Sequence, residues 1–188
     1  MNKQNEKSVN NDLINSIENR YLKHRYLKTY EFIKKFISPK ETILDLGTEN
    51  QFSKILKSSG YNVHNTQGQD FDFDFIIKDG NKFDAIIALE ILEHLVSPFP
   101  LLLNLNSNKL IATIPLKLWF DSAYRNPDNE WDWHYHEFES WQFDWLLQKS
   151  GWKIIHSEKW NSPLAKIGIR PVIRSLTPRY YAVYAIRG

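Results

Sequence analysis

The sequence contains no cysteine, no long apolar run and almost no net charge. The absence of cysteine excludes disulfides, thiolate metal sites and cysteine-based catalysis. No uncharged apolar stretch reaches the ~18 residues that a membrane-spanning helix needs. A formal net charge of +2 is too small to indicate a nucleic-acid-binding protein, so no nucleic-acid partner is expected. These absences predict a cytoplasmic protein without a transmembrane segment.

The N-terminal residues 1–12 are rich in Asn and Lys and contain no apolar signal core. We predict a disordered tail there and a single domain over residues 13–188, a length sufficient for one sizeable core. All seven tryptophans fall in the C-terminal half of the chain. They indicate either an aromatic core, which is the commoner arrangement, or an aromatic-lined pocket.

Strands and helices are predicted to alternate along the domain. The strands are expected at residues 42–46, 61–65, 83–89, 109–114, 153–159 and 179–186, and the helices at residues 13–37, 51–59, 98–105 and 140–150. The first helix is either long or broken and ends at Ser38-Pro39, and the last is capped by Ser140. Alternating strands and helices predict a parallel-dominated α/β sheet.

The strand at residues 42–46 runs into Asp45-Leu46-Gly47, a glycine turn that leads into a helix. In open α/β sheets, ligands bind beyond the carboxyl ends of the strands. Backbone N–H groups at such a turn and helix N-terminus can hold an anionic group. On its own, the Asp-x-Gly turn is equally compatible with an ordinary strand-to-helix connection.

A second buried strand, residues 83–89, continues into the segment 90–94, with the sequence Glu-Ile-Leu-Glu-His. Together, the two strand ends resemble the first and fourth strands of class I S-adenosylmethionine (SAM)-dependent methyltransferases of the type 11/23-like group. The resemblance covers residues 20–188 and implies a Rossmann-like three-layer α/β sandwich. It also implies SAM as the cofactor.

The resemblance implies a set of cofactor-binding residues at the ends of the strands. They are Asp45, Gly47, Thr48, Thr66, Asp72, Ala88, Leu89 and Glu90. The chain departs from the family pattern in the glycine loop, where Glu49 and Gln51 replace later glycines and a Cβ restricts close backbone approach. It departs again at Thr66, where the family has an acidic residue for the ribose. Asp72 would contact the adenine, or alternatively belong to a solvated acidic sheet edge.

Only three residues, 67–69, separate Thr66 from the alternating Asp-Phe run at residues 70–75. A right-handed parallel crossover needs roughly a dozen residues or more. We therefore predict no helix between Thr66 and Asp70, so that the fold is shortened after the second strand. The alternation in residues 70–75 is strand-like, with aspartates on one face and phenylalanines on the other.

The Glu-x-x-Glu-His form of segment 90–94 resembles two subgroups, the ubiquinone-biosynthesis O-methyltransferases and the small-RNA 3′-end 2′-O-methyltransferases. In both, the two glutamates and the histidine bind a divalent metal. The resemblance implies a metal site of Glu90, Glu93, His94 and, further along the chain, His136. Such ligands suit Mg²⁺, Mn²⁺ or Zn²⁺. Without a metal, His94 or His136 is a candidate general base or a structural hydrogen-bonding residue, and the glutamates would cap a helix N-terminus.

Two segments in the C-terminal half are candidates for substrate binding. Residues 119–136 are rich in aromatic side chains and predict an acceptor pocket that faces His94. Residues 162–179 are basic and apolar, which fits a phosphate-bearing or lipid-linked substrate, or peripheral contact with a membrane surface. A helix that packs on the sheet with its arginines in water is the plainer alternative.

The function implied by the resemblance is SAM-dependent methyl transfer. The expected acceptor is an oxygen of a small metabolite or of a sugar- or lipid-linked intermediate. The alternative is a degenerate methyltransferase fold that serves as a non-catalytic binding or scaffold protein. The altered glycine loop and the missing helix favour the alternative, whereas Asp45, Gly47 and the intact segment 90–94 favour the enzyme. The sequence indicates no oligomeric state.

Overall fold

The computed structural model describes residues 13–76, 82–163, 173 and 175–187. Its helical elements are α2 (Arg20–Phe36), α3 (Gln51–Ser58), η1 (Leu92–His94), α4 (Pro98–Asn104), η2 (Glu130–Asp132) and α5 (Ser140–Lys149). Its strands are β1 (Thr42–Asp45), β2 (Asn62–Asn65), β3 (Ala85–Leu89), β4 (Lys109–Pro115), β5 (Lys153–Asn161) and β6 (Pro178–Ile186). The predicted tail, residues 1–12, and much of the basic segment 162–179 lie outside the described residues.

The strands form one six-stranded sheet in the order β2-β1-β3-β4-β6-β5. β1 pairs in parallel with β2 and β3, and β3 pairs in parallel with β4, whereas β6 runs antiparallel to β4 and β5. The strand order reverses at β1, so the carboxyl ends of β1 and β3 form a topological switch point, where open α/β sheets bind ligands. This arrangement confirms the predicted parallel-dominated α/β sheet.

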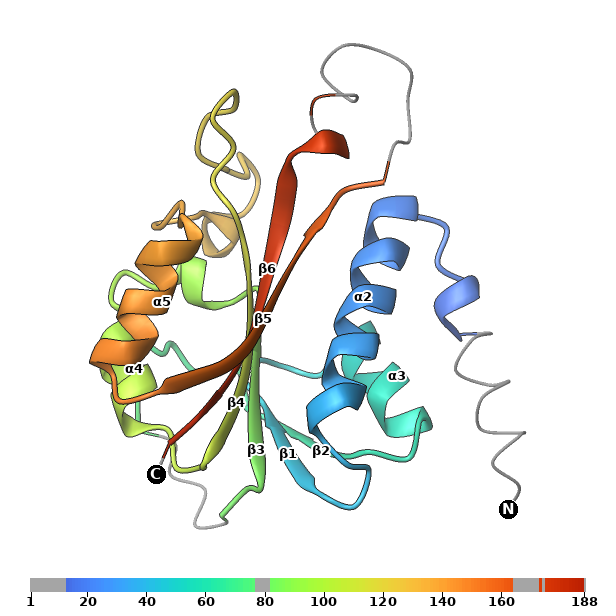
Figure 1. Ribbon diagram of the computed structural model, residues 1–188, viewed down its shortest axis with the longest axis vertical. Helices are drawn as coiled ribbons and strands as arrows, with labels where there is room; N and C mark the ends of the chain where they lie inside the picture. Colours follow the sequence, from blue (N-terminus) through green and yellow to red (C-terminus); the bar gives the residue numbers. More distant parts are fainter. Residues whose placement is uncertain (1–12, 77–81, 164–172, 174, 188) are drawn as a thin grey trace.

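Helices cover both faces of the sheet, with α2 and α3 on one side and α4 and α5 on the other (Figure 1). α2 buries Thr29, Phe32 and Ile33, which share one helical face, and α5 buries Phe143 and Leu147, one turn apart. Each helical layer packs a hydrophobic core of its own against the strands, as expected for a three-layer sandwich. No helix in the described ranges is long and apolar enough to cross a membrane.

Local capping explains where two of the helices begin. The predicted first helix is broken, because residues 13–15 are helical and α2 starts anew after Asn19, whose side chain accepts from two backbone N–H groups of the first turn. The prediction that Ser140 caps the last helix is wrong. Glu139 occupies the N-cap position, and its N–H donates to Gln142 Oε1.

The connection between β2 and β3 has no helix between Thr66 and Asp70, which confirms the predicted shortening at this point. The strand-like structure predicted for residues 70–75 is wrong. Asp70 O instead accepts the N–H groups of Phe73 and Asp74 and closes a turn. β2 is therefore the last strand on its side of the sheet among the described residues.

The same turn explains the alternation of aspartate and phenylalanine without a strand. Phe71 is buried in the core, whereas Phe73 is 82% exposed. The Asp72 carboxylate accepts from the backbone N–H groups of Val96 and Ser97, directly before α4. The alternative of a solvated acidic sheet edge is therefore wrong for Asp72.

The tryptophans divide between the core and the surface. Trp152 and Trp160 are buried, whereas the exposed ones are Trp119, Trp131, Trp141 and Trp145. The expectation of an aromatic core is therefore wrong for most of these rings. Those of segment 119–136 remain free to line a cavity.

A buried carboxylate ties together the elements that meet at the switch point. Asp45, at the end of β1, is 3% exposed, and its Oδ2 accepts from Ser53 Oγ of α3 (2.7 Å) and Asn65 Nδ2 of β2 (3.1 Å). Burial raises the pKa of Asp45 to about 6, although the two hydrogen bonds act in the opposite direction. The ionised carboxylate is therefore costly in the folded protein.

We expect Asp45→Asn to change the pH dependence of stability. A carboxyl whose pKa rises on folding contributes stability below its unfolded pKa of about 4, and this contribution is lost as the pH rises through about 6. Two pKa units correspond to roughly 2–3 kcal/mol. Urea unfolding across this pH range should therefore show the free energy of unfolding of the wild type falling relative to that of Asp45→Asn.

The matched control is Glu49→Gln, because Glu49 is an exposed carboxylate whose pKa is lowered by a hydrogen bond to Lys57. This variant should not reproduce the effect. A difference between wild type and Asp45→Asn that stays constant across the pH range would contradict the raised pKa of the buried carboxyl.

Candidate functional site

Two cavities open at the carboxyl ends of the strands. The larger, which we call the cleft, has a volume of about 750 Å³ and is lined mainly by the turns after β1, β2 and β3. The smaller, which we call the polar pocket, has a volume of about 330 Å³ and lies between α2, the ends of β3 and β4, and segment 119–136. Both cavities adjoin the switch point of the sheet.

Two glycine turns form one wall of the cleft. Gly47, after β1, has a φ of 138°, and its N–H donates to Thr66 Oγ1 (2.8 Å). Gly68, after β2, has a φ of 79°, and a Cβ at this position would lie 2.9 Å from Thr48 Cγ2. Side chains at either glycine would strain the backbone, and one at Gly68 would also collide with the facing turn.

In the altered glycine loop, Glu49 and the neighbouring Asn50 are engaged within the protein, and Gln51 is the exposed first residue of α3. Glu49 is exposed and forms an ion pair with Lys57 of α3, so its charge is balanced outside the cleft. The Asn50 side chain caps α3 by accepting from the N–H groups of Phe52 and Ser53. Two donors of this helix N-terminus are therefore already satisfied.

The cleft is also walled by apolar side chains that remain accessible to solvent. Phe73, Val96, Trp131 and Tyr135 all line it and are 82%, 58%, 77% and 60% exposed. Trp131 and Tyr135 belong to segment 119–136, which the sequence assigned to the acceptor. Large exposed rings around a cavity are typical of a surface that a ligand covers.

An ion pair between distant parts of the chain lies in the polar pocket. Arg25 Nη1 of α2 is 3.2 Å from Oε2 of Glu90, which follows β3. Glu90 has a φ of 53°, uncommon for a residue with a side chain, and its N–H donates to Thr113 O of β4 (2.9 Å). Burial raises the pKa of Glu90, and Arg25 acts in the opposite direction. Strained backbone held in this way is typical of functional sites.

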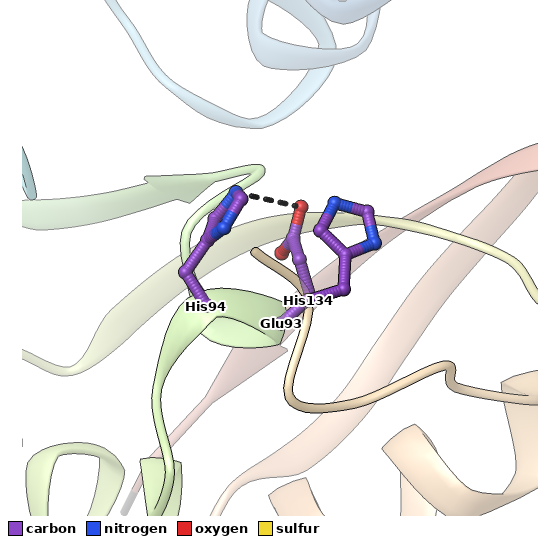
Figure 2. A group of neighbouring side chains, drawn as sticks. All are labelled: Glu93, His94 and His134. Atoms are coloured by element: carbon purple, nitrogen blue, oxygen red, sulfur yellow. Dashed lines mark ion pairs between the residues drawn. The ribbon is translucent and has the colours of Figure 1, made fainter. Parts of the chain in front are cut away.

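Three side chains of metal-ligating type converge in the same pocket: Glu93 and His94 of η1 and His134 of segment 119–136 (Figure 2). One ligand atom from each lies within 4.8 Å of the others. The Glu93 carboxylate is 1% exposed and lies between the two imidazoles, with Oε1 3.8 Å from His94 Nε2. Burial and the nearby Glu90 raise the pKa of Glu93 well above its usual range. Burial and His94 lower the pKa of His134.

His94 lines both the cleft and the polar pocket. Its Nδ1 lies 3.0 Å from Trp133 O, so this nitrogen carries the proton and donates to the carbonyl. Nε2 is then the basic nitrogen, on the side of Glu93. His136 differs, because its Nε2 lies 3.2 Å from Val96 O and it lines neither cavity. The loop thus brings the side chain of His134, rather than that of His136, beside those of Glu93 and His94.

The cofactor residues implied by the resemblance fall into three groups. Those that line the cleft are Gly47, Thr48 and Asp72. Those that line the polar pocket are Leu89 and Glu90. Those that are buried and line neither cavity are Asp45, Thr66 and Ala88. Within the last group, Asp45 and Thr66 hold the turns of the site in place through their hydrogen bonds.

Sequence reasoning missed the contribution of the N-terminal helix and the last strand. Arg25 and Tyr26 of α2 and Tyr180 of β6 line the polar pocket. In the sequence, they are ordinary members of an amphipathic helix and of a strand, so no local signal distinguishes them. His134 carried a signal, since it lies in the run Trp-His-Tyr-His, but only the path of the loop decides which histidine faces inward.

No family model and no curated protein sequence matches the chain. Solved structures nevertheless share its fold. A SAM-dependent methyltransferase from Mesorhizobium loti is 13% identical, with a TM-score of 0.60 over 84% of this chain and 97% of that one. Another from Archaeoglobus fulgidus is 16% identical, with a TM-score of 0.60 over 86% and 92%.

A third similar structure is a chain from the complex between the Haloferax volcanii Trm112 methyltransferase activator and a methyltransferase. It is 10% identical, with a TM-score of 0.61 over 98% of this chain and 94% of that one. At such identities the likeness concerns the fold alone. The chain therefore has the Rossmann-like fold of SAM-dependent methyltransferases.

Proposed function

We propose that the protein transfers a methyl group from SAM to a small-molecule acceptor. The observation that carries the proposal is the position of His94, which lines both the cleft and the polar pocket. Methyl transfer requires the cofactor and the acceptor to meet in line at one point. Two cavities that share a histidine offer such a point, and the fold agrees with this class of reaction.

In this proposal the cleft holds the cofactor. Its volume of about 750 Å³ falls in the range of cofactor sites, roughly 300–1,000 Å³. The turn at Gly47 and Thr48 lies beside the amino-acid part of SAM, and the exposed rings of Phe73 and Trp131 offer apolar faces to the adenine. Asp72, on the same wall, stays our candidate for an adenine contact.

The polar pocket then holds the acceptor, with an oxygen as the expected reactive atom. When bound, SAM would supply the methyl group and keep the electron pair of the C–S bond on sulfur. His94 Nε2 would take the proton of the acceptor hydroxyl, whose oxygen would form the new bond to the methyl carbon. SAM has a good leaving group, so orientation and exclusion of water contribute more than the strength of the base. The geometry favours His94 over His136 as this base, since His136 lines neither cavity.

A non-catalytic binding or scaffold protein is the second candidate. It is favoured by Glu49 and Gln51 in the glycine loop and by the lack of an acidic residue at Thr66. A scaffold, however, would gain nothing from the strained backbone of Glu90 or from a basic imidazole nitrogen between two cavities. We therefore favour the enzyme.

A divalent metal is a further candidate for the polar pocket, because Glu93, His94 and His134 present a carboxylate and two imidazoles to one point. Two members of the set predicted from the sequence do not belong to this group. Glu90 lines the same pocket but pairs with Arg25, and His136 Nε2 lies against Val96 O. When bound, a metal would polarise an acceptor hydroxyl.

Calorimetric titration with S-adenosylhomocysteine tests the cofactor assignment. We expect binding by the intact protein and at least tenfold weaker binding, ~1.4 kcal/mol, by Gly47→Ala, because a Cβ strains the turn at a φ of 138°. Trp131→Ala should also weaken binding, and it should leave the melting temperature unchanged because this side chain is 77% exposed.

Gly60→Ala is the matched control, since Gly60 also has a positive φ (85°) but lines neither cavity. It should bind S-adenosylhomocysteine like the wild type. Absence of measurable binding by the wild type at millimolar ligand would favour the non-catalytic alternative.

Titration with Mn²⁺ tests the metal candidate and separates the two histidines. If a metal binds, His134→Ala should abolish binding and His136→Ala should retain it, because only His134 reaches Glu93 and His94. If His136→Ala abolished binding and His134→Ala retained it, the result would support the ligand set predicted from the sequence. A wild-type protein that binds no Mn²⁺ or Zn²⁺ would leave His94 as a metal-free base.

A further inference from the structure

Two carboxylate oxygens in the polar pocket have no hydrogen-bond partner within the described structure. Glu93 is 1% exposed, and its Oε2 accepts no hydrogen bond. Glu90 pairs with Arg25 through Oε2, but its Oε1 is buried and unpartnered. A buried carboxylate oxygen without a hydrogen-bond donor carries an energetic cost. A ligand that brings donors to this pocket would recover that cost.

The charges that line the pocket are not balanced. Two arginines, Arg25 and Arg179, face three carboxylates, Glu90, Glu93 and Asp132. With the histidines neutral, ionisation of Glu93 leaves one negative charge in excess, which agrees with the raised pKa of this carboxyl when no cation is bound. Asp132 already accepts from Tyr124 Oη and Asn126 Nδ2, so the uncompensated acceptor is the Glu93–Glu90 pair.

Aromatic rings complete the lining. Tyr26 and Phe52 pack against each other with ring centroids 5.0 Å apart, and Tyr180 lies in the same wall. Carboxylates beside aromatic faces bind an organic cation through hydrogen bonds and through attraction to the rings. The volume of about 330 Å³ is far larger than a metal ion needs and suits a small organic molecule.

We propose that the acceptor carries a protonated amine, which Glu93 anchors with help from Glu90 in the polar pocket. The ammonium group is the recognition element, and a hydroxyl of the same molecule presents the oxygen to His94. A metal at Glu93, His94 and His134 would leave Glu90 Oε1 unpartnered, whereas an ammonium group has three donors to share. The assignment of this cation to an acceptor depends on the proposed methyl transfer.

The test compares benzylamine with benzyl alcohol, which match in shape and differ in charge. NMR titrations are run with a chelator present, and with and without saturating S-adenosylhomocysteine. We expect benzylamine to bind at least tenfold more tightly, with or without S-adenosylhomocysteine. Glu93→Gln should remove this preference, whereas Glu49→Gln, at an exposed carboxylate outside both cavities, should keep it.

Equal binding of the two probes by the unmodified protein would overturn the proposal, and this comparison requires no variant to fold. A folded Glu93→Gln that keeps the preference would also overturn it. Displacement of benzylamine by S-adenosylhomocysteine would assign the carboxylates to the cofactor's own ammonium and refute the acceptor role. A preference for the amine in a protein that binds no S-adenosylhomocysteine would support the cation site and reject methyl transfer. Failure of the cation site and failure of the proposed methyl transfer are therefore distinguishable.

Discussion

The short connection between β2 and β3 is the constraint on which the rest of the site depends. After Asn65 the chain has to pass β1 and enter β3 at Ala85. This leaves no length for an additional helix and strand, so β2 ends the sheet among the described residues. One wall of the cleft is instead built by the turn at residues 70–73, and Trp131 and Tyr135 of segment 119–136 line the same cleft.

Three carboxylates lie at the same edge of the sheet: Asp45 and Glu93 are buried, and the Glu90 side chain is 15% exposed. Asp45 is stabilised by hydrogen bonds from α3 and β2, and Glu90 by Arg25 of α2. Glu93 keeps one oxygen without a donor. The first two explain how distant elements are joined at the switch point. No hydrogen bond within the described structure offsets the burial of this oxygen, which points to a ligand in the polar pocket.

The sequence predicted what depends on local chemistry and chain length. The glycine turn at Gly47 and the lack of a helix after Thr66 follow from residue type and spacing, and both are confirmed. The sequence did not predict the features that depend on contacts between distant parts of the chain. The alternation at residues 70–75 has the period of a strand but no neighbouring strand to pair with, so it folds into a turn. His134 and His136 differ only in which one the loop directs inward, and Arg25 reaches Glu90 only because α2 packs on this face of the sheet.

Segment 119–136 links the two cavities. Trp131 and Tyr135 line the cleft, while Tyr124 and His134 line the polar pocket. Between them, Trp133 O accepts from His94 Nδ1 and so fixes which imidazole nitrogen is basic. The backbone of this segment is also bound to η1, because Glu93 O accepts the N–H groups of Tyr135 and His136. The segment that lines the cleft with Trp131 and Tyr135 is therefore also the segment whose backbone orients the His94 imidazole beside the polar pocket.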